Sequence, residues 1–232
     1  MSSIAENLRI INDRIADACN RAGRDVNTVK LIVVTKSATP DQIKEVISLG
    51  YTDLGENRVQ QLKKISDEMG EYIQSLPSLP KKLNWHMIGH LQRNKVKLVA
   101  GVDLLHTVDS ARLVDALAAR AGETTRVLVQ VSLAGEEQKS GAAPADVPAL
   151  LAAIQATNGR VVARGLMTMP PLTDDPEAVR PVFRALRELR DRLGGPNLLP
   201  ELSMGMSGDF EVAIEEGATL VRVGTAIFGA RG

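Results

Sequence analysis

The sequence lacks an excess of charge of either sign, a long hydrophobic run and a second cysteine. Its 28 Lys and Arg residues equal its 28 Asp and Glu residues, so it has no basic surplus to bind nucleic acid through phosphates. No apolar stretch approaches the roughly 20 residues that a membrane-spanning helix needs. The first 20 residues carry Glu6, Asp13 and Asp17 and no apolar core, so we predict no signal peptide. The lone Cys19 excludes an intrachain disulfide and indicates a reducing cytoplasm.

What the sequence does contain is a regular alternation of short β-type segments and segments with helical periodicity. Its 232 residues are 44% apolar, which is typical of a soluble globular protein. Leu31 to Thr35 is a β-branched run of the kind that is buried on both faces of a parallel sheet. We expect eight strands, at 31–35, 52–54, 84–88, 104–108, 126–133, 162–167, 202–206 and 219–223.

The helical segments between these strands carry start and stop signals. Thr39 can cap a helix, Pro40 fits its first position, Gln42 completes a capping box and Gly50 ends the helix. The other helices are expected at 1–24, 57–69, 93–99, from an Asp109 cap onward, and near 147–154, 179–189 and 210–214.

Eight strand–helix units in a chain of this length predict a closed (β/α)₈ TIM barrel. We expect a single domain over residues 1–232, with the N-terminal helix (1–24) packed on the barrel. An open, doubly wound parallel sheet is the alternative, since the same alternation allows it. A dinucleotide-binding sheet is disfavoured, because no G-x-G-x-x-G follows the first strand. Active sites of such barrels lie at the C-terminal ends of the strands, so the reactive residues are expected there.

Lys36 directly follows the first strand. Alternation along the strand places Ile32, Val34 and Lys36 on one face, pointing into the barrel. An amine above an apolar floor is desolvated, which lowers its pKa and makes it nucleophilic, as Schiff-base chemistry requires. A solvated lysine that merely finishes a strand is the alternative, and it is favoured for Lys36 taken alone.

The last two strands end in small residues and hydroxyl groups. Strand seven runs into the segment with Ser207, and strand eight into Gly224 and Thr225. In barrels these two ends often form a phosphate site, although Ser207 could simply cap a helix and the glycines simply turn the chain. Arg222, inside strand eight, is either a salt-bridge partner or a cation that faces a ligand. An amine, a phosphate site and an inward arginine together indicate a phosphorylated aldehyde as the ligand.

A series of short motifs runs through the chain. They are Val34-Thr35-Lys36, Gly55-Glu56-Asn57, Trp85-His86-Met87-Ile88-Gly89, Leu91-Gln92-Arg93-Asn94-Lys95, Lys139-Ser140-Gly141, Gly165-Leu166-Met167, Gly205 to Asp209 and Val221 to Gly229. Any one of them is a weak signal, but all of them in order and at compatible spacing are a strong one. From the first strand to Gly229, the sequence resembles the YggS/PROSC family of pyridoxal phosphate homeostasis proteins, which are similar to the barrel domain of alanine racemase.

The resemblance implies a fold-type III barrel that binds pyridoxal 5′-phosphate (PLP) as its cofactor. Lys36 would hold PLP as an internal aldimine, and Arg222 would face the pyridine nitrogen. Because a guanidinium stays protonated, the ring nitrogen would stay largely unprotonated, which disfavours carbanion chemistry without excluding it. The other residues that the resemblance places around PLP are Ser207, Gly224 and Thr225 at the phosphate, Asn57 beside the cofactor, and His86 and Met167 at the pocket wall.

Two functions from different classes fit such a site. The first is a non-catalytic protein that binds PLP, buffers its concentration in the cell and passes it to PLP-dependent apo-enzymes. The second is an amino-acid racemase, which needs a second proton donor opposite the lysine. In the racemases that this chain resembles, that donor belongs to a separate C-terminal domain, and the chain ends at Gly232, directly after the last barrel unit. We therefore expect the carrier. His86 is a candidate for a substitute base, although a hydrogen-bonded pocket histidine is the favoured interpretation of it.

A Schiff-base aldolase acting on a phosphosugar is a third, weaker alternative, since it shares the barrel, the lysine and the phosphate site but binds no chromophore. We predict no metal site, because His90 and His106 have no Cys or carboxylate partners at ligand spacing. Without the C-terminal domain the usual racemase dimer interface is missing, so we expect a cytoplasmic monomer that binds neither nucleic acid nor a membrane.

Overall fold

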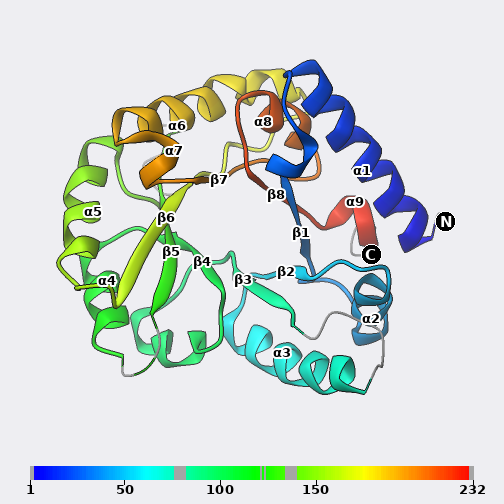
Figure 1. Cartoon of the computed structure of the whole chain (residues 1–232), viewed down its shortest axis with the longest axis horizontal. Helices are drawn as coiled ribbons and strands as arrows, with labels where there is room; N and C mark the ends of the chain where they lie inside the picture. Colours follow the sequence, from blue (N-terminus) through cyan, green and yellow to red (C-terminus); the bar gives the residue numbers. More distant parts are fainter. Residues whose placement is uncertain (1–2, 76–81, 121, 123, 134–139, 230–232) are drawn as a thin grey trace.

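The computed structural model describes residues 3–75, 82–120, 122, 124–133 and 140–229, and the strands among them close into a parallel barrel. Each strand pairs with the next one along the chain, and β8 pairs with β1 (Figure 1). The strands are β1 (Lys30–Val34), β2 (Asp53–Glu56), β3 (Asn84–Met87), β4 (Leu104–Val108), β5 (Thr125–Gln130), β6 (Val161–Met167), β7 (Glu201–Ser203) and β8 (Leu220–Val223). The predicted closed barrel is confirmed, and the open sheet is wrong.

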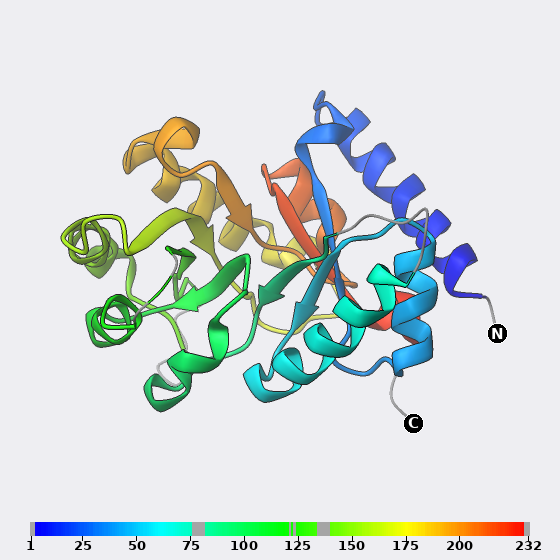
Figure 2. The same cartoon turned by 60° about the horizontal axis from the view of Figure 1, so that its bottom comes forward.

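Helices and short 3₁₀ turns surround the barrel on its outer side (Figure 1 and Figure 2). They are α1 (Ile4–Arg21), η1 (Val26–Thr28), α2 (Pro40–Ser48), α3 (Val59–Gln74), η2 (Arg93–Val99), α4 (Ala111–Ala118), η3 (Pro144–Asp146), α5 (Val147–Gln155), η4 (Pro176–Val179), α6 (Arg180–Arg192), α7 (Gly195–Leu198), α8 (Phe210–Glu215) and α9 (Thr225–Phe228). The extra helix α1 packs beside α8 and α9, so it covers the segments that follow β7 and β8.

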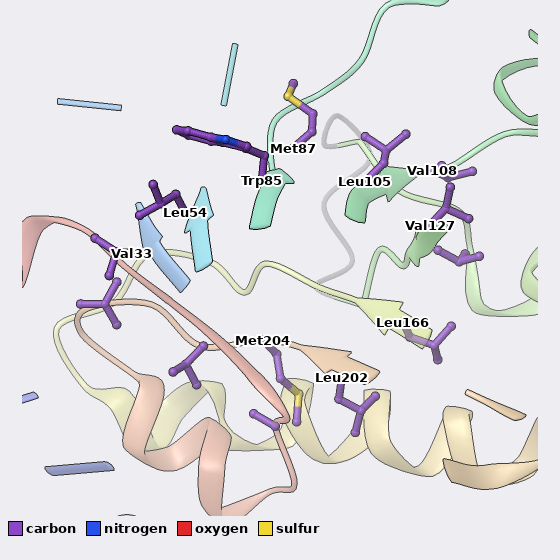
Figure 3. Close-up of a cluster of buried hydrophobic side chains, with 14 of the residues drawn as sticks. Val33, Leu54, Trp85, Met87, Leu105, Val108, Val127, Leu166, Leu202 and Met204 are labelled. Atoms are coloured by element: carbon purple, nitrogen blue, oxygen red, sulfur yellow. The ribbon is translucent and has the colours of Figure 1, made fainter. Parts of the chain in front are cut away.

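Side chains alternate along the strands between the helix layer and the barrel interior. The apolar core between strands and helices includes Leu202 and Met204, which reach toward the helix at the bottom of Figure 3. A second, smaller apolar cluster fills part of the barrel interior and consists of Ile32, Leu104, Leu128, Met167 and Leu220. Polar side chains are buried in the interior as well, among them His86, His106, Ser203 and Arg222.

The start of α2 and the bounds of the helix at 93–99 form as predicted, whereas the cap predicted at Asp109 is wrong. Thr39 and Gln42 form the reciprocal capping box, with Pro40 in the first turn. Residues 93–99 form a 3₁₀ helix without a side-chain cap. Helix α4 begins after Ser110 and not after Asp109, whose carboxylate faces His90 at 4.0 Å. None of the described helices combines the length and apolar character that crossing a bilayer requires.

Candidate functional site

A cavity of about 480 Å³ opens at the C-terminal ends of the strands, where this fold places its active sites. Its wall includes Lys36 after β1, Asn57 after β2, Ser207 after β7, Arg222 from β8 and Thr225 from α9. A smaller cavity of about 150 Å³ shares Lys36, Asn57 and Thr225 with it, so the two spaces adjoin. A volume of several hundred Å³ suits a small organic ligand. We call the larger space the mouth cavity.

Lys36 stands at the mouth of the barrel and not in its interior. Strand β1 ends at Val34, and the chain turns at Lys36 and Ser37 before α2 begins. Lys36 is exposed, whereas Val34 is only 6% exposed. The expected shielding of the amine above an apolar floor is therefore wrong, because the turn carries the lysine beyond the buried part of the strand. Lys36 nevertheless faces both cavities, since it contributes to both walls.

Asn57 is held close to Gly89 where β2 and β3 end. A Cβ atom on Gly89 would lie 2.0 Å from the backbone oxygen of Asn57, so only glycine fits there. The hydroxyl of Thr107, from β4, donates a hydrogen bond to the backbone oxygen of Gly89 over 2.7 Å. These contacts fix three strand ends relative to one another, and all three residues line the mouth cavity.

The ends of β7 and β8 come together on one side of the mouth cavity. The backbone N–H of Ala226 donates to Ser207 Oγ over 3.3 Å. Gly224 lies so close to β1 that a Cβ atom on it would be 2.9 Å from the backbone oxygen of Val34. Ser207, Gly224 and Thr225 line the same wall as a result. Small residues and hydroxyl donors of this kind suit an anionic group that approaches the backbone.

Arg222 places a charged group inside the barrel, with only 4% of the residue exposed. Its Nη1 donates to Ser203 Oγ, and its Nη2 donates to the backbone oxygen of Thr168 over 3.1 Å. Burial lowers the pKa of Arg222 to about 10, although the charge of Asp209 acts in the opposite direction. The guanidinium therefore stays protonated at neutral pH. Because both hydrogen-bond partners are neutral, its charge favours an anion or a hydrogen-bond acceptor in the mouth cavity.

His86 and Met167 do not line the mouth cavity, contrary to expectation. His86 is in register with Leu104, the first residue of β4, so it lies toward the other end of the barrel. There it lines a cavity of about 350 Å³ together with Asp53. We call this space the N-terminal cavity. Met167 is fully buried in the interior apolar cluster. Both residues lie near the ends of their strands, but the stagger between neighbouring strands puts them below the mouth.

Gln130 and Asp209 are among the residues of the mouth cavity that were not predicted as site residues. Gln130, the last residue of β5, donates to the backbone oxygen of Ser140 over 2.8 Å. The alternation that points Leu128 inward could have identified Gln130. Asp209 accepts a hydrogen bond from the backbone N–H of Met206 over 2.6 Å. Burial raises the pKa of Asp209, while that hydrogen bond and the charge of Arg222 act in the opposite direction. Lys139, which precedes Ser140 in the same motif, lies outside the described residues.

His106 and Ser203 were missed as well, although they lie next to Arg222. His106 is completely buried, and its ring nitrogens contact His86 and Ser203. The sequence raised His106 only as a candidate metal ligand. In the part of the chain that the structure describes, no group of three or more His, Cys, Asp or Glu side chains could hold a metal ion.

Comparison with known proteins gives a consistent result over the whole chain. A sequence model of the alanine racemase N-terminal domain matches residues 3–232. The pyridoxal phosphate homeostasis protein of Aquifex aeolicus is 44% identical over 233 residues, which cover 97% of both chains. A solved structure of an unknown protein from Bifidobacterium adolescentis superposes with a TM-score of 0.88 at 36% identity, covering 97% of this chain and 94% of that one. The structure of PipY from Synechococcus elongatus, solved with PLP bound, superposes with a TM-score of 0.73 at 35% identity. The match covers 94% of this chain and 100% of PipY.

Proposed function

The chain belongs to the family of the alanine racemase N-terminal domain and the pyridoxal phosphate homeostasis proteins, and we propose that it binds PLP at the mouth of its barrel and serves PLP homeostasis. Its relative from Aquifex aeolicus carries that name, and PipY has PLP bound. The observation that carries the proposal is the convergence of Lys36, Ser207, Arg222 and Thr225 on one cavity. An amine, hydroxyl donors and a buried cation match the aldehyde, the phosphate and the ring nitrogen of PLP in turn.

Each of these residues takes one part of the ligand. Lys36 would hold the aldehyde, since condensation of its Nζ with the aldehyde carbon would form a C=N bond and release one water molecule. Ser207, Thr225 and the backbone of Gly224 hold the phosphate, and Arg222 donates a hydrogen bond to the ring nitrogen. When bound, PLP supplies an electron-withdrawing ring conjugated to that C=N bond. Asn57 lines both cavities, so its amide would lie beside the ring of bound PLP.

We place this protein among carriers of PLP and not among enzymes that use it. Arg222 remains protonated at neutral pH, so it gives the ring nitrogen a hydrogen bond and not a proton. A ring without that proton draws electrons weakly, which suits holding the cofactor. As a buffer of free PLP the chain would pass it to PLP-dependent apo-enzymes. We propose that it does so in the cytoplasm as a monomer, in agreement with its single, buried cysteine.

An amino-acid racemase is the alternative, and it needs a second proton-transfer group across from Lys36. His86, the candidate for that group, lines the N-terminal cavity and not the mouth cavity. In the described wall of the mouth cavity, the titratable side chains besides Lys36 and Arg222 are His90 and Asp209. Incubation of the PLP-loaded protein with L-alanine, followed by chiral chromatography, separates the two functions. The carrier forms no D-alanine above the rate of free PLP, whereas sustained turnover would establish the racemase.

Absorbance spectroscopy tests PLP binding itself. We expect the purified protein, mixed with PLP, to develop a visible band that is absent in Lys36→Ala. Lys64→Ala is the matched control, because Lys64 is an exposed lysine of α3 outside both cavities. Its spectrum should equal that of the unaltered protein. A colourless protein that takes up no PLP would contradict the proposal and favour the aldolase, and an unchanged band in Lys36→Ala would exclude Lys36 as the attachment point.

A further inference from the structure

Five polar side chains form a continuous hydrogen-bonded chain through the barrel interior. Asp53 Oδ1 lies 3.0 Å from His86 Nε2, and His86 Nδ1 lies 3.0 Å from His106 Nε2. His106 Nδ1 lies 2.8 Å from Ser203 Oγ, which also accepts a hydrogen bond from Arg222 Nη1. Asp53 and His86 line the N-terminal cavity, and Arg222 lines the mouth cavity, so the chain connects the two ends of the barrel.

The interior of such a barrel is normally filled by branched apolar side chains. Here, His106 and Ser203 are completely buried and His86 is 4% exposed. Burying polar groups is costly unless every one of them is paired. Each of these five residues is hydrogen-bonded to the next, from Asp53 to Arg222. Such a fully paired network is expected where buried polar groups have a function.

The chemistry of the two ends determines the direction of the hydrogen bonds. Arg222 can only donate. Burial raises the pKa of Asp53, but the hydrogen bond from His86 and the charge of Lys30 outweigh it and lower the pKa below its usual value. Asp53 is therefore ionised at neutral pH and can only accept. The hydrogen bonds must therefore point from the donor Arg222 toward the acceptor Asp53.

The histidines between these ends then have one arrangement that satisfies every group. Burial, together with the charges of His86 and Arg222, lowers the pKa of His106 well below its usual range, so its ring is neutral. Since Asp53 only accepts, His86 Nε2–H donates to it, and His86 Nδ1 then accepts from His106 Nε2–H. The bare Nδ1 of His106 accepts the hydroxyl proton of Ser203. The lone pairs of Ser203 are thereby left for Arg222.

We propose that Ser203, His106, His86 and Asp53 are positioning residues that hold the Arg222 guanidinium against the ring nitrogen of PLP. His106 sets the rotation of the Ser203 hydroxyl, so that this hydroxyl acts toward Arg222 only as an acceptor. Asp53 supplies a negative charge at the far end, and each hydrogen bond of the chain is polarised toward it. The inference rests on the proposed function, because it assigns a role toward bound PLP.

The experiment compares PLP affinity and the absorbance spectrum of bound PLP across matched variants. Asp53→Asn removes the charge at the end of the chain, and Ser203→Ala removes the acceptor for Arg222. Asp103→Asn is the control, because Asp103 lies at the same N-terminal cavity and also bonds to β3, through Trp85 N–H, but is not part of the chain. Both Asn variants remove one negative charge from the same cavity.

We expect Ser203→Ala to weaken PLP binding about tenfold, as the loss of a hydrogen bond to a charged group predicts. Asp53→Asn should shift the visible band and weaken binding several-fold, and Asp103→Asn should change neither. His106→Leu should behave like Ser203→Ala, whereas His106→Gln, which keeps one acceptor and one donor, should recover most of the affinity. Thermal unfolding of each variant verifies that it is folded.

The outcomes separate this inference from the proposed function. If the unaltered protein takes up no PLP, the proposed function itself fails. If it binds PLP, and folded Asp53→Asn and Ser203→Ala both keep the original affinity and spectrum, the positioning role is overturned. Equal shifts in Asp53→Asn and Asp103→Asn would overturn it too, since the effect would then be one of charge in the cavity. If His106→Leu does not fold, the result for Asp53→Asn decides whether the positioning role holds. The Asp53 side chain is 14% exposed, so its replacement disturbs the barrel interior least.

Discussion

Gly224 approaches Val34 so closely that a Cβ atom on the glycine would lie 2.9 Å from the valine's backbone oxygen. This contact joins the end of β8 to the end of β1, where the barrel closes. It brings Thr225, which follows the glycine, to the same cavity wall as Lys36. The proposed phosphate and aldehyde contacts of PLP therefore come from opposite ends of the chain and depend on the closure of the barrel.

Replacement of this glycine is expected to damage both stability and binding. Gly224→Ala should lower the free energy of unfolding by about 1–3 kcal/mol, since the added methyl group overpacks the closure. PLP affinity should fall with it, because Thr225 is displaced. Urea unfolding and absorbance titration measure the two effects. Gly70→Ala is the control: Gly70 lies inside α3 with open space around it, so alanine should stabilise the protein by about 0.5–1 kcal/mol and leave binding unchanged. Equal behaviour of the two variants would contradict the account of the closure.

The hydroxyl of Ser207 is predicted to be a phosphate contact. Ser207→Ala should weaken PLP binding about tenfold and leave the covalent attachment to Lys36 intact, because a hydrogen bond to a charged phosphate is lost. Ser66→Ala, at a half-buried position of α3 outside both cavities, should leave the affinity unchanged. Binding of pyridoxal, which lacks the phosphate, provides a second measurement. If Ser207→Ala weakens pyridoxal as much as PLP, Ser207 does not contact the phosphate.

Glu216 should make the stability depend on pH in the acid range. Burial raises the pKa of Glu216, but hydrogen bonds from Arg184 and Arg180 and the charge of Arg187 outweigh it and lower the pKa below its usual value. The unfolded carboxyl titrates near its ordinary value of about 4.3. The stabilisation is therefore complete above that value and is lost as the pH falls through the lower pKa of the folded protein.

Glu216→Gln should accordingly lower the free energy of unfolding by about 1–3 kcal/mol at pH 7, and by much less below pH 4. Urea unfolding across this range measures the difference. Glu188→Gln, an exposed position on α6, should change stability by less than about 0.5 kcal/mol at either pH. A Glu216→Gln deficit that stays constant down to pH 3 would show that packing, and not the carboxylate charge, is responsible.

Cys19 should report on the integrity of the fold. It is 1% exposed in α1, and burial raises the pKa of its thiol. Since the thiolate is the reactive form, a thiol reagent should modify Cys19 slowly in the native protein and rapidly in urea. Fast modification under native conditions would show that α1 is not packed on the barrel as described.

The barrel could be predicted from the sequence, because the signals for its strands and helices lie in short stretches of residues. Short β-branched runs such as Leu31 to Thr35 alternate with amphipathic helices, and the Thr39 capping box is read directly from residue types. That Ser207, Gly224 and Thr225 line one cavity could also be predicted, since the topology fixes the ends of strands seven and eight.

The position of individual side chains along the barrel axis could not be predicted from the sequence, because it depends on the stagger between strands. His86 is opposite the first residue of β4 and therefore points to the N-terminal cavity. Lys36 lies beyond the last strand residue, in a turn whose position alternation does not specify. The pairing of His106 with Ser203 joins residues from β4 and β7, which no spacing rule in the sequence connects.

Mass spectrometry after borohydride reduction identifies the residue to which PLP is attached. The C=N bond formed by PLP becomes a stable amine on reduction, so a proteolytic digest reveals which lysine carries it. We expect one PLP group per chain, on the peptide that contains Lys36. If the protein acquires no PLP mass after saturation with the cofactor, or carries it on a different lysine, Lys36 does not hold PLP.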